Sequence, residues 1–342
     1  MSYKRFDPED VVVSAESITS PIWSGDSTTL TTFFTSSTQT GGASGDYYYD
    51  IYQTASNLTG ARVQFSVAYA DKLGSGSLLF NSNVEGKAPS STVFGQYRNL
   101  VLGDENTDFT FGEVNSDHFY AINVDRARYK EKILPGTLDL KLNISGSTNV
   151  LRLTDNSKVV STTSFTDSGR VFELITGSIG TLATGKVQSN GYTSNSGSYG
   201  KLLPDIGVLL INGNALKAPV ANGGLAFTSS RGNNALGNNN LASFYELLNY
   251  GSNFRLQSEE TISSNFIFVR ARNSEFNYST NPSIITGSGE LIHNVMINTP
   301  QSYMTTVGLY NDNNDLLAVA KLSRPLLKDF TKESLIRIKL DY

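Results

Sequence analysis

Apolar residues alternate with polar residues in several short segments of the chain. Between residues 63 and 69 every second side chain is apolar, and the same spacing recurs over residues 138–144 and 336–342. Successive side chains of a strand point to opposite faces, so this period of two predicts strands with one dry and one wet face. We therefore expect a mainly β protein, built from β-sandwich-like modules with long polar loops and one or two short helices.

The C-terminal part of the chain has the densest strand pattern. Strands are expected at residues 266–272, 295–297, 304–309, 316–322 and 336–342. The Asn- and Asp-rich residues between the third and fourth of these strands indicate a turn, because both residue types tolerate a left-handed backbone. Since hairpin-linked strands pair most often, we expect the final strand to pair with 316–322 or 304–309.

Helical patterns are few. Residues 240–250 carry apolar side chains at helical spacing, which predicts a helix that Asn240 caps and Gly251 closes. Residues 92–102 fit either a strand or a short helix.

Polar loops dominate the middle of the chain. Residues 185–200 and 228–240 are rich in Gly, Ser and Asn and have no periodicity, so we interpret them as long surface loops. The continuous apolar run 206–211 predicts a strand, and Asn212-Gly213 after it is a typical hairpin turn.

The N-terminal residues 1–45 predict an extended arm, because they contain too few regularly spaced apolar residues for a core of their own. Val11, Val12, Val13 and Ile18 have no local partner in the sequence pattern. We expect these four side chains to be buried on a neighbouring subunit. The expected division of the chain is thus the arm 1–45, a β domain 46–150, a loop-rich β region with one helix 151–255, and a C-terminal β module 256–342.

One group of charges has a regular spacing. Arg126, Arg128, Lys130 and Lys132 occupy every second position, so in an extended chain they share one face. Such a row could face an acidic partner or nucleic acid. Nearby acids argue against nucleic acid, and we favour a solvated strand face paired with these acids over an interface. We keep the four residues as candidate interface residues.

The composition excludes several kinds of catalytic and metal-binding site. The chain of 342 residues has a net charge of -4, no cysteine and two histidines. These counts exclude a thiol nucleophile and cysteine-bound metal, and they leave little for a histidine-based relay. We therefore expect no catalytic residue, cofactor or metal site. The lack of a basic excess argues against a general role in nucleic-acid binding. No window of the sequence suggests a signal peptide or a membrane span, and we expect a cytoplasmic product or part of an assembly formed there.

Three segments together carry a resemblance to a known family. They are YKRFDPEDVVVSAESITSPIWS near the N-terminus, YADKLGSGS with VFGQYRNLVLGDE and RYKEKILPG in the first half, and the C-terminal stretch from SSNFIFVRARNSEF to IRIKLDY. They resemble a virion structural protein of contractile-tailed (myovirus) phages, especially those of marine cyanobacteria. The C-terminal stretch is also similar to modules of baseplate wedge and tail-fibre attachment proteins.

This resemblance implies a non-enzymatic structural subunit of the phage virion, in a tail baseplate of the wedge type or in the tail-to-head connector. It implies a homo-oligomer assembled in the host cytoplasm and located in the virion. Its partners would be baseplate, tail tube, sheath or neck subunits. The alternative is a carbohydrate-binding or carbohydrate-degrading tail receptor protein, in which Tyr47, Tyr48 and Tyr49 would form a stacking platform.

Overall fold

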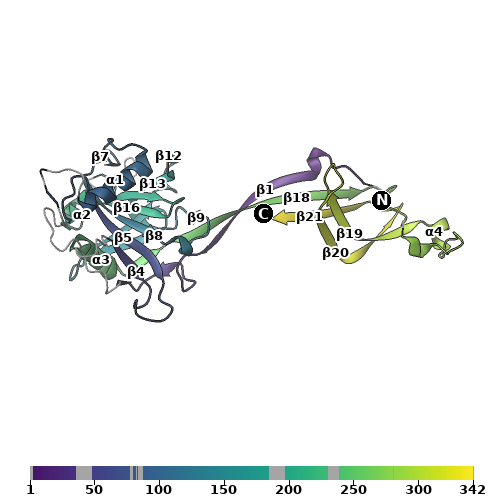
Figure 1. The fold of residues 1–342 in the computed structure, drawn as a ribbon, viewed down its shortest axis with the longest axis horizontal. Helices are drawn as coiled ribbons and strands as arrows, with labels where there is room; N and C mark the ends of the chain where they lie inside the picture. Colours follow the sequence, from purple (N-terminus) through teal and green to yellow (C-terminus); the bar gives the residue numbers. More distant parts are fainter. Residues whose placement is uncertain are drawn as a thin grey trace. The chain divides into compact units, whose positions relative to one another are not determined.

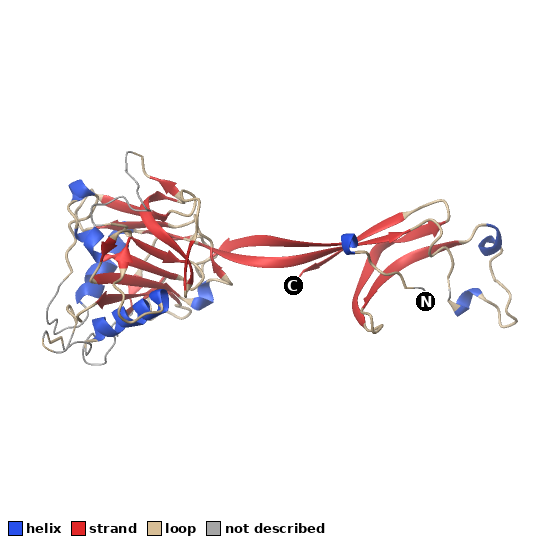
Figure 2. Ribbon diagram, turned by 90° about the horizontal axis from the view of Figure 1, so that it is seen from above, coloured by secondary structure: helices blue, strands red, loops and turns tan. Residues whose placement is uncertain are grey.

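The computed structural model describes residues 3–35, 48–77, 80–81, 83, 88–184, 197–229, 239–279 and 281–341. The chain forms two compact units. We call Ile18–Glu260 the central unit, and Met1–Ser17 with Thr261–Tyr342 the terminal unit. Strands dominate both units (Figures 1 and 2), so the protein is mainly β as its sequence pattern predicts.

The central unit is built around one large antiparallel sheet. Its strand order is β2-β17-β10-β11-β13-β15-β16-β8-β5-β4-β3, and β12 and β14 also pair with β13. The bounds are β2 (Thr29–Leu30), β3 (Phe34–Thr35), β4 (Tyr48–Tyr52), β5 (Val63–Asp71), β8 (His118–Val124), β10 (Asp139–Asn143), β11 (Val150–Asp155), β12 (Ser164–Thr166), β13 (Gly169–Ser178), β14 (Thr181–Leu182), β15 (Gly200–Leu203), β16 (Val208–Asn212) and β17 (Asn253–Arg255). The short strands β6 (Thr110–Phe111) and β7 (Val114–Asn115) form a separate ribbon.

The sheet of the central unit curls on itself. Its two outermost strands, β2 and β3, are consecutive in the chain and are joined by residues 31–33. A linker of this length spans at most about 14 Å. Laid flat, the eleven strands of the path would place these edges about 48 Å apart, at about 4.8 Å per strand. The sheet must therefore bend until its edges approach each other.

Two helices cover the two faces of this curled sheet. Tyr120 of β8 stacks on Phe244 of α3 (Asn239–Gly251), with ring centroids 4.4 Å apart, and α3 contacts both β5 and β10. The next residue, Phe119, faces the other side, where its ring lies 5.3 Å from that of Phe94 in α1 (Pro89–Leu102). Because neighbouring residues of a strand point to opposite faces, one strand supplies both cores.

The structure corrects several predictions about turns and caps. The helix expected at 240–250 is present, but it begins at Asn239, so Asn240 lies within it and is not its cap. The Asn240 Nδ2 donates to the carbonyl of Gly76 at 3.0 Å. After Gly251, Ser252 takes the left-handed conformation. Asn212-Gly213 is not a hairpin turn. The Asn212 side chain instead accepts a hydrogen bond from Asn214 and caps α2 (Gly213–Lys217). Residues 92–102 resolve as a helix within α1.

The terminal unit contains a sheet and a ribbon. The sheet has the order β1-β18-β21, with β1 (Val11–Pro21), β18 (Gln257–Ala271) and β21 (Ser334–Asp341). Both β1 and β18 cross the boundary between the units. The ribbon pairs β19 (Gln301–Tyr310) with β20 (Leu316–Asp329). Short helices are η1 (Pro8–Asp10), η4 (Pro282–Ile284) and α4 (Val295–Asn298), and in the central unit η2 (Arg126–Arg128) and η3 (Val220–Asn222).

Two strand predictions for the terminal unit are wrong. The final strand does not pair with either strand of the hairpin. It pairs with β18 in an antiparallel register that places Ile338 opposite Ile267. Residues 295–297 belong to the helix α4 and not to a strand. The strands expected at 266–272, 304–309 and 316–322 are present, and all three extend further than their sequence patterns indicated.

The domain division also differs from the expected one. The ranges 46–150 and 151–255 lie in one unit, because β10 pairs with β11 across their expected boundary. The arm is shorter than expected, since Ile22, Trp23 and Phe33 are buried in the central core. Most of the two expected polar loops, and residues 36–47, fall outside the described residues.

Candidate assembly surfaces

The terminal unit has a very small core. Only Ile267, Leu309, Ile336 and Ile338 among its described residues form its buried apolar cluster, and even these are 6–9% exposed. More of the exposed large apolar side chains belong to this unit than to the central unit, although it is less than half as long. A core of this size supplies little of the stabilisation that an independent domain needs. Partly buried apolar side chains, among them Val269, Met304 and Leu340, pack against this cluster.

Alternation assigns the residues of β1 to the two faces of its sheet. Glu16 Oε2 lies 3.7 Å from Lys339 Nζ, so Glu16 lies on the face opposite to Ile336 and Ile338. Val11 and Val13, at odd positions, therefore lie on the core side. They are nevertheless 38% and 68% exposed. We call these two residues the valine row; it is a stretch of core-side sheet that the unit's own ribbon leaves uncovered.

The other candidate residues of the N-terminal segment are exposed as well. Val12 lies on the Glu16 side of the sheet and is 48% exposed. Ile18, the first residue of the central unit, is 44% exposed. The segment before β1 is held within its own unit, because Lys4 Nζ donates to the carbonyl of Arg270 at 2.6 Å and pairs with Glu275 at 3.1 Å. The amide of Arg272, together with Lys4, lowers the pKa of Glu275 below its ordinary value.

The β19–β20 ribbon has a second apolar row. Its inward side chains, such as Leu309 and Ala318, pack on the terminal core. Val319 alternates with these and is 57% exposed, and Leu317, at a bulge in the strand, is 68% exposed. We call this pair the ribbon row. Gly308 lies opposite Val319 in the ladder, and the ring of Tyr310 lies against that glycine.

The sequence contained a signal for the ribbon row that the alternation analysis did not use. Residues 316–320 read Leu-Leu-Ala-Val-Ala, which is apolar at every position. A strand with one wet face alternates, whereas a continuous apolar run is typical of a strand covered on both faces.

The basic residues do not form one face, so that prediction is wrong. The Asp125 side chain accepts a hydrogen bond from the Ala127 amide and starts the helical turn η2, which interrupts the extended chain. The Arg126 guanidinium donates to the Tyr129 carbonyl at 2.6 Å and lies over that ring. Lys130 forms an ion pair with Glu260 at 2.8 Å, and Lys132 lies 3.5 Å from Glu131. Arg128 is half-buried. At least three of the four cations thus have partners within the central unit.

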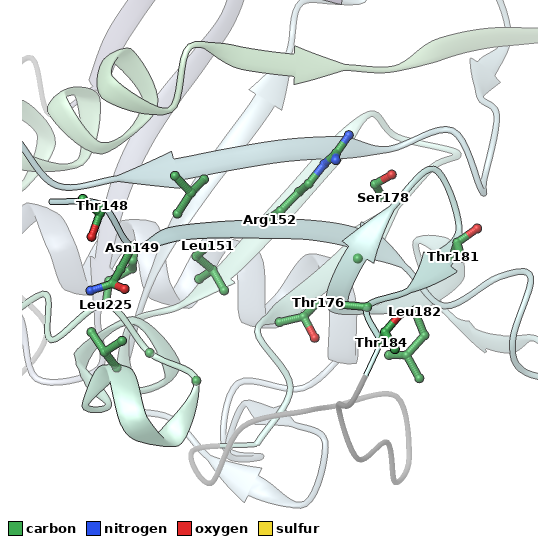
Figure 3. A pocket seen from close by; sticks show the side chains of 16 residues that line it. Thr148, Asn149, Leu151, Arg152, Thr176, Ser178, Thr181, Leu182, Thr184 and Leu225 are labelled. Atoms are coloured by element: carbon green, nitrogen blue, oxygen red, sulfur yellow. The ribbon is translucent and has the colours of Figure 1, made fainter.

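The central unit also has an open pocket of about 580 Å³. Thr148, Asn149 and Leu225 lie at one end, and Thr181, Leu182 and Thr184 at the other (Figure 3). Arg152 is part of its lining, but the guanidinium forms a two-pronged ion pair with Asp139 at 2.6 and 2.7 Å. Among the described residues, the lining includes hydroxyl and amide groups but neither a carboxylate nor an aromatic ring. These described groups can form hydrogen bonds with a ligand.

The two histidines occupy different environments. His118 is buried, and its Nδ1 lies 2.6 Å from Asp117 Oδ1. His293 is exposed. Within the described ranges, no group of three or more His, Cys, Asp or Glu side chains is arranged to hold a metal ion. No helix in the described part of the chain is long and apolar enough to cross a membrane.

Tyr48 and Tyr49 are consecutive in β4, so they do not form one platform. Tyr48 is exposed, whereas Tyr49 packs against the central core. Tyr47 lies outside the described residues.

Comparison of the chain with protein-family models, with curated proteins and with solved structures finds no match.

Proposed function

We propose that the chain is a non-enzymatic structural subunit of a phage virion, which acts through contacts with other subunits. The observation that carries this proposal is that the terminal unit buries few apolar side chains and exposes many. Four residues form its buried cluster, while β1 and β20 expose apolar side chains. Exposed apolar patches of this kind mark surfaces for protein association. Assembly on a neighbouring subunit would bury these side chains.

The resemblance of the C-terminal residues to phage baseplate wedge and tail-fibre attachment modules supports a place in the contractile tail. The similar segments coincide with β19, β20 and β21 of the structure. We therefore favour a baseplate or a tail-to-head connector as the location, with tail tube, sheath or neck subunits as neighbours. The chain would be made in the host cytoplasm and incorporated there.

Antibody labelling tests this proposal. Antibodies raised against the central unit are applied to purified particles of the phage that encodes the chain, and the particles are viewed by electron microscopy. Labelling at the tail supports the proposal. Particles that lack the chain by both labelling and mass spectrometry would contradict it.

A carbohydrate-binding or carbohydrate-degrading tail receptor protein is the second candidate. The hydroxyl- and amide-lined pocket of the central unit favours binding, because saccharides are recognised through such hydrogen bonds. The described lining residues include no carboxylate, whereas glycoside hydrolysis uses a carboxylate pair. Reproducible binding on a glycan array, lost in Thr176→Val, would favour this candidate.

A further inference from the structure

We propose that the pocket of the central unit binds an extended peptide, which adds to one edge of β11 as a short strand. The occupant would be an uncharged, extended segment of another protein chain. This inference goes beyond the proposed function, because it assigns a binding site that the central unit forms by itself.

One edge of β11 is paired along only part of its length. On one side, β10 pairs with residues 150–153 of β11. On the other side, β13 pairs only with Leu153, Thr154 and Asp155. No described residue pairs with residues 150–152 on that side. We call this stretch the open edge; it lines the pocket throughout (Figure 3).

The open edge directs backbone donors and acceptors into the pocket. The amide of Asn156, just after β11, donates to the carbonyl of Glu173 in β13 at 3.0 Å. Backbone groups of alternate residues point to the same edge of a strand, so those of Val150 and Arg152 point to this side as well. No described group forms a hydrogen bond with their N–H and C=O groups. The two residues are about 6.8 Å apart along the strand, which is the two-residue repeat of an extended peptide.

The gap beside the open edge exists because the end of β13 folds away into a hairpin. Gly177 has a φ of +154°, and a Cβ at this position would lie 2.0 Å from a backbone oxygen of β14. The amide of Ile179 donates to the Leu138 carbonyl at 3.0 Å, and that of Gly180 donates to Thr154 Oγ1 at 2.6 Å. These contacts hold the hairpin, so the fold itself keeps β13 from pairing with the open edge.

The walls of the pocket favour an uncharged peptide. Arg152 is the only charged side chain among the described lining residues, and Asp139 pairs with its guanidinium at 2.6 and 2.7 Å. Val150 and Val220 also line the pocket and are 50% and 44% exposed, so they can contact apolar side chains of a bound segment. In strand addition, main-chain hydrogen bonds supply affinity and such side-chain contacts supply preference.

The row of backbone groups distinguishes a peptide from a saccharide. An extended peptide presents an N–H and a C=O at every second residue along one edge, which matches the open edge group for group. A saccharide would depend on side-chain hydroxyls of the pocket, such as that of Thr176. Backbone and side-chain substitutions therefore separate the two ligands.

Peptide selection on the full chain tests the site. A library of random linear peptides is selected on the immobilised chain, and the affinity of the selected peptides is measured by fluorescence anisotropy. Methylation of single backbone nitrogens in a selected peptide should weaken binding about tenfold at alternate positions and leave the positions between them unchanged, because only alternate N–H groups face β11. Hydrogen exchange at the amides of Val150 and Arg152 should slow when the peptide is added.

A proline variant tests the same contact from the side of the protein. Val150→Pro removes one N–H that faces the pocket and keeps the ladder with β10, because proline is tolerated at the first residue of a strand. It should raise the dissociation constant of the selected peptides about tenfold. The matched control Val150→Thr keeps the N–H and should bind nearly as well as the natural chain. Circular dichroism verifies that both variants are folded.

Three results would overturn the inference: a library that yields no binder, a methylation scan without a period of two, or equal affinities of Val150→Pro and Val150→Thr. Binding that is lost in Thr176→Val and unchanged in Val150→Pro would overturn it too, and would assign the pocket to a ligand held by side chains. None of these results decides whether the chain is found in virions, so failure of the peptide site and failure of the proposed function are distinguishable.

Discussion

The central and terminal units distribute their apolar residues in opposite ways. In the central unit, a curled sheet buries aromatic side chains on both faces, and Phe65, Phe254 and Phe119 are completely inaccessible to solvent. In the terminal unit, the buried cluster has four members and the strands expose apolar side chains on both sides. The first unit has the core of an independent domain. The second exposes many apolar side chains, as a subunit would that acts through the contacts we propose.

The largest effect is expected from removal of the last strand. Deleting residues 333–342 removes β21, which supplies Ile336 and Ile338, two of the four buried residues of the terminal cluster. It also leaves one edge of β18 unpaired, and unpaired strand edges promote aggregation. We expect the terminal unit to unfold and the protein to aggregate, as measured by light scattering.

The only tryptophan, Trp23, is buried in the central unit and reports on that unit alone. Its fluorescence transition should survive the deletion. A shortened protein that remains monodisperse with an intact terminal unit would show that β21 is not part of that unit's core.

The next largest effect is expected for Phe65→Ala. The Phe65 ring lies within 5.1–6.2 Å of the rings of Trp23, Phe33 and Phe254, and none of it is exposed. Replacing a buried phenylalanine by alanine leaves a cavity and costs about 3–5 kcal/mol. Urea unfolding followed by Trp23 fluorescence should show this loss. A loss below about 1 kcal/mol would contradict the view that the central core is tightly packed.

Acidification should affect the central unit through Asp205. Partial burial raises the pKa of this carboxyl, but hydrogen bonds from Arg170 outweigh that effect, so its pKa lies below the ordinary value. A carboxyl with a lowered pKa stabilises the folded state above its unfolded pKa of about 4, and the stabilisation is lost as pH falls through the folded pKa. Because the pair is partly exposed, we expect a contribution of only about 1 kcal/mol.

Asp205→Asn should therefore lower the stability at neutral pH and flatten its dependence on acid, as followed by Trp23 fluorescence. Asp312→Asn, in an exposed turn of the terminal unit, serves as the control. An unchanged acid dependence in Asp205→Asn would assign the effect to other carboxyl groups.

The sequence revealed local structure better than it revealed pairing. Alternation located β5, β10 and β21 because a strand with one buried face has a period of two. It could not show that β21 pairs with β18, because the chain between them returns through the β19–β20 ribbon. The prediction that the four basic residues between 126 and 132 share one face was wrong for a local reason. The Asp125 side chain caps a helical turn, which interrupts the extended chain.

The sequence predicted some residues of the candidate surfaces and missed others. Val11, Val12 and Val13 were selected because they lacked local partners, and the structure places all three on an exposed strand. Leu317 and Val319 were missed because exposure depends on which face the ribbon turns to the core. That choice is made by tertiary packing and not by the strand's own pattern.

The smallest effect on stability is expected for Val12→Thr. Val12 is exposed on the face opposite to the valine row, so its replacement should change the free energy of unfolding by less than about 0.5 kcal/mol. Urea unfolding followed by circular dichroism checks this. A loss above about 1 kcal/mol would show that Val12 is buried in the folded chain.

Hydrogen exchange of the full chain, free and in purified particles, tests most directly whether the terminal unit acts through contacts with other subunits. The account predicts that backbone amides of β1 and β20 exchange more slowly in the particle than in the free chain, while those of β8 and β16 in the central unit do not change. Equal exchange of β1 and β20 in the free and the assembled chain would contradict it.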